Sequence, residues 1–488
     1  MGSCRWWKWL ISAGFAGLLA ACAGTGGLRP QSSLRGADSL AASRTVAAAD
    51  VAMGEWPRVD WWKQFNDPQL DTLIERGLTG SPSLGIAAAR VREALAAAMS
   101  ERAPLFPRID GDFESVRQRL SDTGVVSPAL AGADWITQTQ LETTLKYELD
   151  FWGRNRAAYE SALGRERAAE VDAFASRLTL SASIALAYAR LQHAYLLLDV
   201  ANATLEQREA VLRLTRQRVG AGLDSRLELK QAEAALPEAR ERIAQLRGAI
   251  GIERDELAAL IGEGPDRGQQ IERPRAQALA PVTVPDNLSV GLLGRRPDIV
   301  AQRLRVEAAQ KDIDVARAQF YPDVQLNGFV GLQSIQLPGF FALSNRAAGV
   351  GPAVTLPIFE GGRLRGQLGS RDAEYDAAVE QYNQTLVQAL REVVDQLTTY
   401  RSLREQQVEQ TAGLRTAQEA YDLAVLRYRE GLGTYLAVLS AETQLLGQRS
   451  LQADLQFQQL TVSIELARAL GGGFTTPAQP RAETASVR

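Results

Sequence analysis

Residues 140–150 read QLETTLKYELD, and apolar side chains alternate in this stretch with polar and charged ones. Successive side chains of an extended chain point to opposite faces, so Leu141 and Tyr147 share one face, and Glu142 and Lys146 the other. This period of two predicts a β-strand with one apolar and one heavily polar face. A soluble sheet shows the same pattern, so the rest of the chain must indicate what covers each face.

Two pairs of strands are expected, and each pair begins after a proline that ends a helix, Pro107 or Pro322. In the second pair, Val324, Leu326 and Val330 repeat the alternation. The expected strands span about 108–120, 136–150, 322–333 and 347–358. No later apolar run is long enough for a membrane-spanning helix, so a membrane crossing would require a closed β-barrel.

Four strands cannot close a barrel, and open strand edges are not tolerated in lipid, so several chains would have to contribute. Two chains would give eight strands around an interior filled by side chains. Three would give twelve strands around a passage, which the polar face favours.

Long helices are expected after each pair of strands. No proline occurs in 152–217 or 365–427, and apolar or small residues recur there at the three- and four-residue spacing of coiled coils. Such helices would extend about 95 Å at 1.5 Å per residue, far beyond a globular core. Each is expected to return through a second helix, 227–261 or 436–470. A rod-like bundle without a lumen is the alternative, and the amphipathic strands argue against it.

The two halves of the chain share one plan. Residues 82–107 match residues 297–322 without a gap, and residues 218–262 match residues 427–471. Two long copies in the same order indicate one domain with internal pseudo-symmetry, not two unrelated domains.

The N-terminus reads as an export signal, with basic residues before an apolar stretch that is too short to span a bilayer. Its end, Leu19-Ala20-Ala21-Cys22, resembles the lipobox of bacterial lipoproteins, so Cys22 is expected to carry lipid and to become the first residue. Cys4 lies in the removed segment, and the mature chain therefore cannot form an internal disulfide.

Composition excludes several classes of function. A formal net charge of −3 and a pI near 5.7 offer no basic field for nucleic acid. His193 is the only histidine and is expected to be structural, since no group of His and Cys has metal-ligand spacing. The glycine-rich segment 262–268 lacks the Lys-Ser/Thr of a phosphate loop. We therefore expect neither an enzyme nor a cofactor.

Four motifs resemble one family. Residues 291–299, GLLGRRPDI, look like the signature of TolC-like outer-membrane efflux proteins, in the lipoprotein branch that serves resistance–nodulation–division pumps. Trp61-Trp62 resembles the start of that branch, and residues 149–154 and 356–363 resemble its strand-to-helix junctions. The similarity extends from about residue 56 to residue 473.

This resemblance implies an α+β membrane protein: a homotrimer with a twelve-stranded outer-membrane β-barrel, four strands per chain, above a periplasmic α-helical coiled-coil tunnel. Drugs, toxic small molecules or metal ions would arrive from an inner-membrane transporter through a periplasmic membrane-fusion adaptor, and the channel would conduct them passively. The expected parts are a signal peptide (1–21), a lipidated segment (22–60), a first repeat (61–262), an equatorial linker (263–290), a second repeat (291–473) and a C-terminal tail (474–488).

The turns between the long helices are the candidate sites. By similarity they lie at the periplasmic tips and meet the adaptor. The docking candidates are Arg218, Val219, Gly220, Gly222, Leu223, Tyr428, Gly431 and Leu432. The family often closes its tip with carboxylates bridged to tyrosine and arginine. Glu228 and Tyr428 match the acidic and tyrosine positions of this gate. Gly433 stands where some relatives have an arginine, so Arg226, Arg427 and Arg429 are gate candidates as substitutes for it.

Two other functions are compatible with the chain. A channel of a type I protein secretion system would use the same fold, and the RRPDI signature and the lipobox weigh against it by resemblance only. A structural envelope lipoprotein would need the coiled coils but would gain nothing from amphipathic strands. The loops near 121–134 and 334–346 are expected to face outside the cell.

Overall fold

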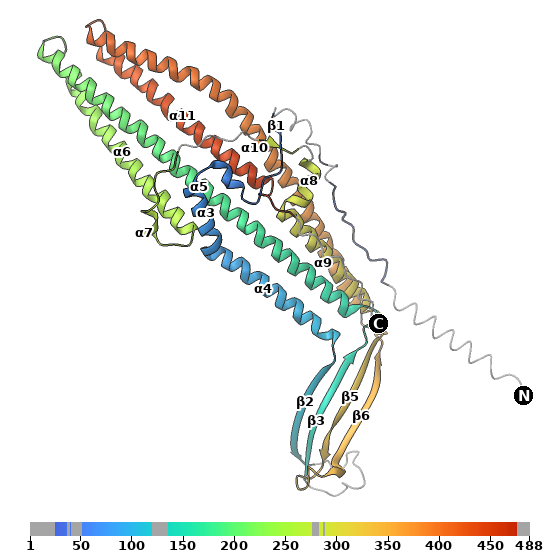
Figure 1. Ribbon diagram of the computed structural model, residues 1–488. Coiled ribbons are helices and arrows are strands. Elements are labelled where there is room, and N and C mark those ends of the chain that lie inside the picture. Colours follow the sequence, from blue (N-terminus) through green and yellow to red (C-terminus); the bar gives the residue numbers. More distant parts are fainter. Residues whose placement is uncertain are drawn as a thin grey trace, which may run out of the picture. The chain divides into compact units, whose positions relative to one another are not determined.

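The computed structural model describes residues 25–36, 40, 51–119, 135–275, 283–285 and 288–475. Cys22, the expected signal peptide, the loop at 121–134 and the residues after 475 lie outside the described residues. Figure 1 shows long helices and a sheet that combines strands from both halves of the sequence.

The first half contains β1 (Ala52–Met53), the 3-10 helix η2 (Trp61–Phe65), α3 (Pro68–Gly80), α4 (Pro82–Arg102), the 3-10 helix η3 (Ala103–Leu105), β2 (Arg108–Gln118), β3 (Ile136–Glu148), α5 (Arg154–Gly220) and α6 (Arg226–Leu260). Then follow α7 (Pro265–Gly268), β4 (Thr283–Val284), α8 (Leu288–Arg295), α9 (Pro297–Ala318), β5 (Asp323–Ser334), the 3-10 helix η5 (Leu343–Asn345), β6 (Arg346–Thr355), α10 (Arg363–Arg429) and α11 (Tyr435–Ala469).

The chain divides into two compact units, and each takes segments from both halves of the sequence. The first unit comprises residues up to 34, 91–169 and 302–382, and it contains the large sheet. The second comprises residues 35–90, 170–301 and 383–488. Neither duplicated half therefore forms a unit of its own.

The large sheet is antiparallel throughout, with the strand order β2-β3-β5-β6. Leu141 lies opposite Phe113 on β2 and Leu332 on β5, so the apolar residues of neighbouring strands share one face. Glu142 lies opposite Asp112 on the other face. Both outer strands, β2 and β6, have an unpaired edge within the described chain.

Most of the apolar face of the sheet is left open by the described part of the chain, and the segment at 337–342 covers only its margin near Thr139. Phe113, Val330, Val350 and Val354 are each more than 60% exposed, so they form no interior core. A water-soluble protein rarely leaves so continuous an apolar surface open. This face is therefore expected to meet lipid or another protein.

The longest helices are α5 and α10, with 67 residues each, and each returns through a helix of 35 residues, α6 or α11. Small side chains allow close packing between helices: a β-carbon built on Gly164 of α5 would lie 3.1 Å from the Cβ of Ala308 on α9. No helix among the described residues is long and apolar enough to cross a membrane.

The core of the second unit lies where η2 and α3 pack on the long helices. Trp61 and Trp62 are almost fully buried in a cluster with Ile74, Ile184 and Leu257. Asp67 begins α3 as its N-cap and accepts a 2.6 Å hydrogen bond from the Tyr188 hydroxyl of α5. The Trp61-Trp62 motif is thus a packing element.

The GLLGRRPDI segment is a structural junction in the second unit. Arg296 is 8% exposed and donates to both carboxylate oxygens of Asp298, to Glu392 of α10 and to the carbonyl of Ala469 at the end of α11. Gly291 leaves room for the Trp56 ring, because a β-carbon there would lie 2.2 Å from that ring. The GLLGRRPDI segment therefore contacts Trp56, α10 and the end of α11, which are all distant from it in the sequence.

Candidate functional site

The two turns between the long helices have the same backbone geometry. In the first turn, Leu223 N–H donates to the carbonyl of Arg218 and Gly222 N–H to that of Val219, while Gly222 has a φ of 74°. This pair of bonds is the Schellman motif, in which a glycine adopts the left-handed conformation that ends a helix. The second turn repeats it: Gly431 has a φ of 77°, and Leu432 N–H donates to the carbonyl of Arg427.

Each turn exposes a leucine directly after its glycine. In a Schellman motif the residue at this position often packs back on its own helix. Here Leu223 is 65% exposed and Leu432 is 72% exposed. Leu227 and Leu436, each the second residue of the returning helix, are 63% and 69% exposed. Both tips therefore present apolar side chains that the described chain does not cover.

Arg218, Asp224 and Tyr428 form a contact between the two helical hairpins, which we name the tip lock. The guanidinium of Arg218 donates to both carboxylate oxygens of Asp224, at 2.9 and 3.1 Å, and to the carbonyl of Tyr428 at 2.7 Å. It also lies 4.6 Å from the centre of the Tyr428 ring. The Tyr428 hydroxyl donates to Asp224 at 2.5 Å, so each of the three residues is hydrogen-bonded to the other two.

The tip lock is shielded from water although the turns around it are exposed. Tyr428 is fully buried, and the side chains of Arg218 and Asp224 are 9% and 10% exposed. The hydrogen bonds from Arg218 hold the pKa of Asp224 below its usual range. Burial, together with the bond to Asp224, raises the pKa of Tyr428 to about 12. Asp224 is therefore ionised and Tyr428 neutral at ordinary pH.

Of the expected gate residues, only Tyr428 lies in the tip lock. Glu228 forms a capping box: Ser225 N–H donates to its carboxylate at 3.0 Å, and the Ser225 hydroxyl caps α6. Arg226, Arg427 and Arg429 are exposed, and none of them makes an ion pair with another described residue. Arg218, predicted as a docking residue, supplies the guanidinium of the lock instead.

Asp224 is the residue of the lock that the sequence analysis did not identify. The repeat aligns Asp224 with Gly433 and Tyr428 with Val219, so the lock has no counterpart in the other half. In the sequence, the only indication of a role for Asp224 is that this charged residue lies two positions after a turn glycine.

A second buried ion pair lies further along the hairpins. Arg208 of α5 donates to Glu442 of α11 at 2.9 Å and to Glu238 of α6 at 3.0 Å. Burial raises the pKa of the Glu442 carboxyl, because Arg208 only partly compensates for the lost water. This pair and the tip lock join both hairpins at two levels.

His193 of α5 has structural contacts. Its Nε2 lies 2.8 Å from Asp454 of α11, and its ring stacks on Phe457 at 4.9 Å. Among the described residues, no group of three or more His, Cys, Asp or Glu side chains could hold a metal ion.

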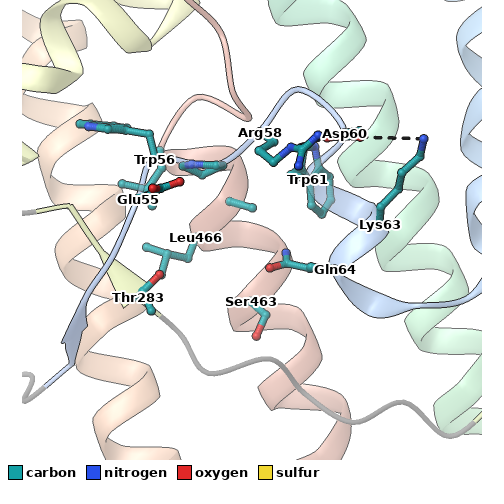
Figure 2. Close-up of a pocket in the computed structure, with 13 residues that line it drawn as sticks. Glu55, Trp56, Arg58, Asp60, Trp61, Lys63, Gln64, Thr283, Ser463 and Leu466 are labelled. Atoms are coloured by element: carbon teal, nitrogen blue, oxygen red, sulfur yellow. Dashed lines mark ion pairs between the residues drawn. The ribbon is translucent and has the colours of Figure 1, made fainter.

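A cavity of about 560 Å³ lies between the segment at 55–64, Thr283 of β4 and α11. Figure 2 shows Asp60 between Arg58 and Lys63, with nitrogen–oxygen distances of 3.3 and 3.8 Å. These opposite charges compensate one another, and Leu466 forms part of the apolar wall. The cavity therefore offers no group of like charges for a ligand.

Comparison with known protein families shows which family the chain belongs to. The profile of the family described as "Outer membrane efflux protein" matches residues 73–263 and 288–472, which together make up more than half of the chain. The chain belongs to this family. The predicted resemblance to TolC-like efflux proteins is thus confirmed, and the protein is an outer-membrane efflux channel protein of a family of channels, not of enzymes.

Three similar proteins illustrate the relationship. The fusaric acid resistance protein FusA of Burkholderia cepacia is 41% identical over 359 residues, which cover 73% of this chain and 67% of FusA. The multidrug resistance outer membrane protein MdtP of Escherichia coli K12 is 33% identical over 436 residues, 87% of this chain and 88% of MdtP. The crystal structure of the outer membrane protein VceC of Vibrio cholerae has a TM-score of 0.81 at 38% identity, covering 86% of this chain and all of VceC.

Proposed function

We propose that three copies of the chain form the outer-membrane channel of a tripartite efflux pump. In this assembly the four-stranded sheets close into a twelve-stranded barrel, and the helical hairpins form a periplasmic tunnel. The observation that carries the proposal is the sheet itself, which has an exposed apolar face, a polar face and two unpaired edges. Three such sheets joined edge to edge satisfy the edges and enclose a polar passage.

Cys22 carries a covalent lipid that anchors the mature chain, after removal of residues 1–21. The two repeats, 61–262 and 291–473, line one passage together, and the linker at 263–290 surrounds its waist. The channel conducts passively, and it catalyses no reaction and needs no cofactor.

The two turns serve as docking sites for a periplasmic adaptor. The exposed leucines Leu223 and Leu432 support this role, because each apolar side chain stands next to a rigid, glycine-containing turn. The other predicted docking residues shape these turns or, like Arg218 and Tyr428, hold the hairpins together. An adaptor that packs on the leucines would gain affinity from apolar burial at a preformed surface.

The tip lock is the proposed gate. While Arg218 holds Asp224 and the Tyr428 carbonyl, the two hairpins cannot separate at their ends. Glu228, Arg226, Arg427 and Arg429 stay gate candidates through contacts between chains, since only Glu228 has a role within its own chain. Adaptor binding beside the lock would open the tunnel by favouring the separated state.

The exported substrates are small organic molecules, delivered by a resistance–nodulation–division transporter. This rests on the names of relatives such as FusA and MdtP, which describe resistance to fusaric acid and to multiple drugs. The alternative is a channel for protein secretion, which would use the same architecture with a different transporter.

The test is a cross-linking experiment in living cells. A cysteine at Leu223→Cys or Leu432→Cys is coupled to a photo-crosslinker, and the captured protein is identified by mass spectrometry. Capture of the adaptor of a proton-driven pump is expected. Capture of an adaptor from an ATP-driven secretion system would transfer the function to protein export, and a folded trimer without any partner at either tip would refute the docking sites. Exposed Leu451 of α11 provides a matched control position away from the turns.

A further inference from the structure

Phe329 stands out on the polar face of the large sheet. The register places it opposite Thr144 of β3 and Gly349 of β6, on the face that carries Glu142 and Lys146. Among the described strand residues of this sheet, it is the only aromatic residue on that face. The other aromatic residues of the four strands, Phe113 and Tyr147, lie on the apolar face.

The ring of Phe329 lies against β6 on one side and is exposed on the other. A β-carbon built on Gly349 would come within 2.6 Å of the ring, so only glycine permits this position. The side chain is nevertheless 43% exposed. On the same face, β6 contributes only small residues next to the ring: Ala347, Gly349, Gly351 and Ala353. An exposed aromatic face thus borders a strip without large side chains.

Carboxylates lie across the sheet from the ring. Glu142 is opposite Gly331 and Lys146 is opposite Asn327, each two residues from Phe329, so both are diagonal neighbours of the ring. Asp112 is opposite Glu142 on β2. Neither carboxylate is in an ion pair with another described residue. These two carboxylates outnumber the single ammonium group of Lys146, so a cation above the ring would meet the negative face of an aromatic system and a net negative charge nearby.

We propose that Phe329 is a specificity-determining residue of the channel, which favours organic cations as they pass through the barrel. The inference rests on the proposed function, because it requires the polar face to line the lumen. In a trimer, three such rings would stand at one level of the passage. Contact with an exposed aromatic ring favours a cation by about two- to fivefold over a neutral molecule of the same shape.

The first measurement tests which face lines the lumen. Asn327→Cys lies two residues from Phe329 on the polar face, and Val330→Cys lies on the apolar face of the same strand. A membrane-impermeant maleimide, added to outer-membrane vesicles, is expected to label the former and not the latter. Preferential labelling of the Val330 position would refute the lumen assignment, and with it the proposed function.

The second measurement tests Phe329 itself. Labelling of Asn327→Cys is followed in the presence of choline or its neutral isostere 3,3-dimethylbutanol, with sodium chloride keeping the ionic strength equal. Choline is expected to slow the labelling more than the alcohol does. Phe329→Leu should reduce this preference by about two- to fivefold, and Phe329→Trp should keep or increase it.

The outcomes separate the two proposals. An unchanged preference for choline in Phe329→Leu, with the Asn327 position still labelled from the water phase, would overturn the role of Phe329 and leave the channel proposal intact. Phe113→Ala is the matched control, since it removes a phenyl group from the opposite face of the same sheet. Should Phe329→Leu fail to form oligomers, the comparison between Phe329 and Phe329→Trp decides, and weaker protection by choline in the tryptophan variant would count against the proposal.

Discussion

Arg218 makes the central contact of the tip lock, so its replacement tests the lock most directly. Arg218→Ala leaves Asp224 and the Tyr428 carbonyl without their donor in a site that excludes water. We expect a loss of about 1–3 kcal/mol in the free energy of unfolding, the usual range for hydrogen bonds to charged groups. Chemical denaturation measures this loss, and single-channel recordings should show more frequent opening.

Two further arginine variants test whether the effect of Arg218→Ala is specific to the tip lock. Arg218→Lys keeps the charge but cannot bond both Asp224 oxygens in the same plane, so its effect should be intermediate. Arg216→Ala removes an exposed arginine of the same helix, which only approaches Glu233 at 3.7 Å, and should change little. An equal effect of Arg216→Ala and Arg218→Ala would show that the lock has no special role.

The ionisation of Asp224 predicts how the lock responds to pH. The pKa of Asp224 is lower in the folded protein than in the unfolded chain. The contribution of Asp224 to the stability of the tip lock is therefore complete above the unfolded pKa, and it is lost as the pH falls through the folded pKa. The channel should therefore stay shut at mildly acidic pH and open only below the usual aspartate range of about 4. Conductance measured against pH tests this, and opening of the wild type near neutral pH would contradict it. Asp224→Asn should show no such acid-dependent step.

At the scale of a single helix, variants of Glu228 distinguish a role in capping α6 from a role in the gate. Its carboxylate accepts from Ser225 at the start of α6, and this contact lowers the pKa of Glu228. Glu228→Ala should therefore destabilise the start of the helix slightly without changing the conductance. Glu228→Gln should retain most of the stability, because glutamine also completes a capping box. An open channel in Glu228→Gln would instead support the predicted gate role.

The segment before the first helix is held to α10 by side chains. Asp376 accepts from the backbone N–H groups of Gln31, at 2.9 and 3.1 Å, and of Ser32, at 2.8 Å. In Asp376→Ala, we expect the amide protons of Gln31 and Ser32 to exchange about tenfold faster or more, as the loss of charge-assisted bonds implies. Hydrogen exchange with mass spectrometry measures this. Glu374→Ala, on the same helix but paired with Arg371, is the control and should leave the segment protected.

At the scale of the whole molecule, regular patterns were predictable from the sequence and unique contacts were not. The strand at Ile136–Glu148 follows from the alternation around Leu141, since period two requires an extended chain. The long helices follow from uninterrupted spacing without proline. The tip lock joins residues more than 200 positions apart and breaks the internal repeat, so no periodicity indicates it. The ring position of Phe329 likewise depends on the pairing of β5 with β6.

The oligomeric state can be tested through the geometry of the sheet. In one chain, β3 and β5 separate β2 from β6, which places the outer strands about 14 Å apart at the usual strand spacing. A disulfide requires Cα atoms within about 7 Å, so a cysteine on β2 cannot reach one on β6 of the same chain. Any disulfide between these strands must therefore link two chains.

Closure of three sheets predicts a specific ladder of products. Ser115→Cys on β2 is combined in turn with Ala348→Cys, Val350→Cys or Val354→Cys on β6, because all four positions lie on the apolar face. Oxidation of at least one pair should give linked dimers and trimers, and no larger species, on a non-reducing gel. Ser115→Cys with Val330→Cys on β5 is the control, since an inner strand cannot contact a neighbouring chain. Ladders that continue past the trimer would show open-ended association, and a product limited to dimers would instead favour an eight-stranded closure, with an interior too narrow for export.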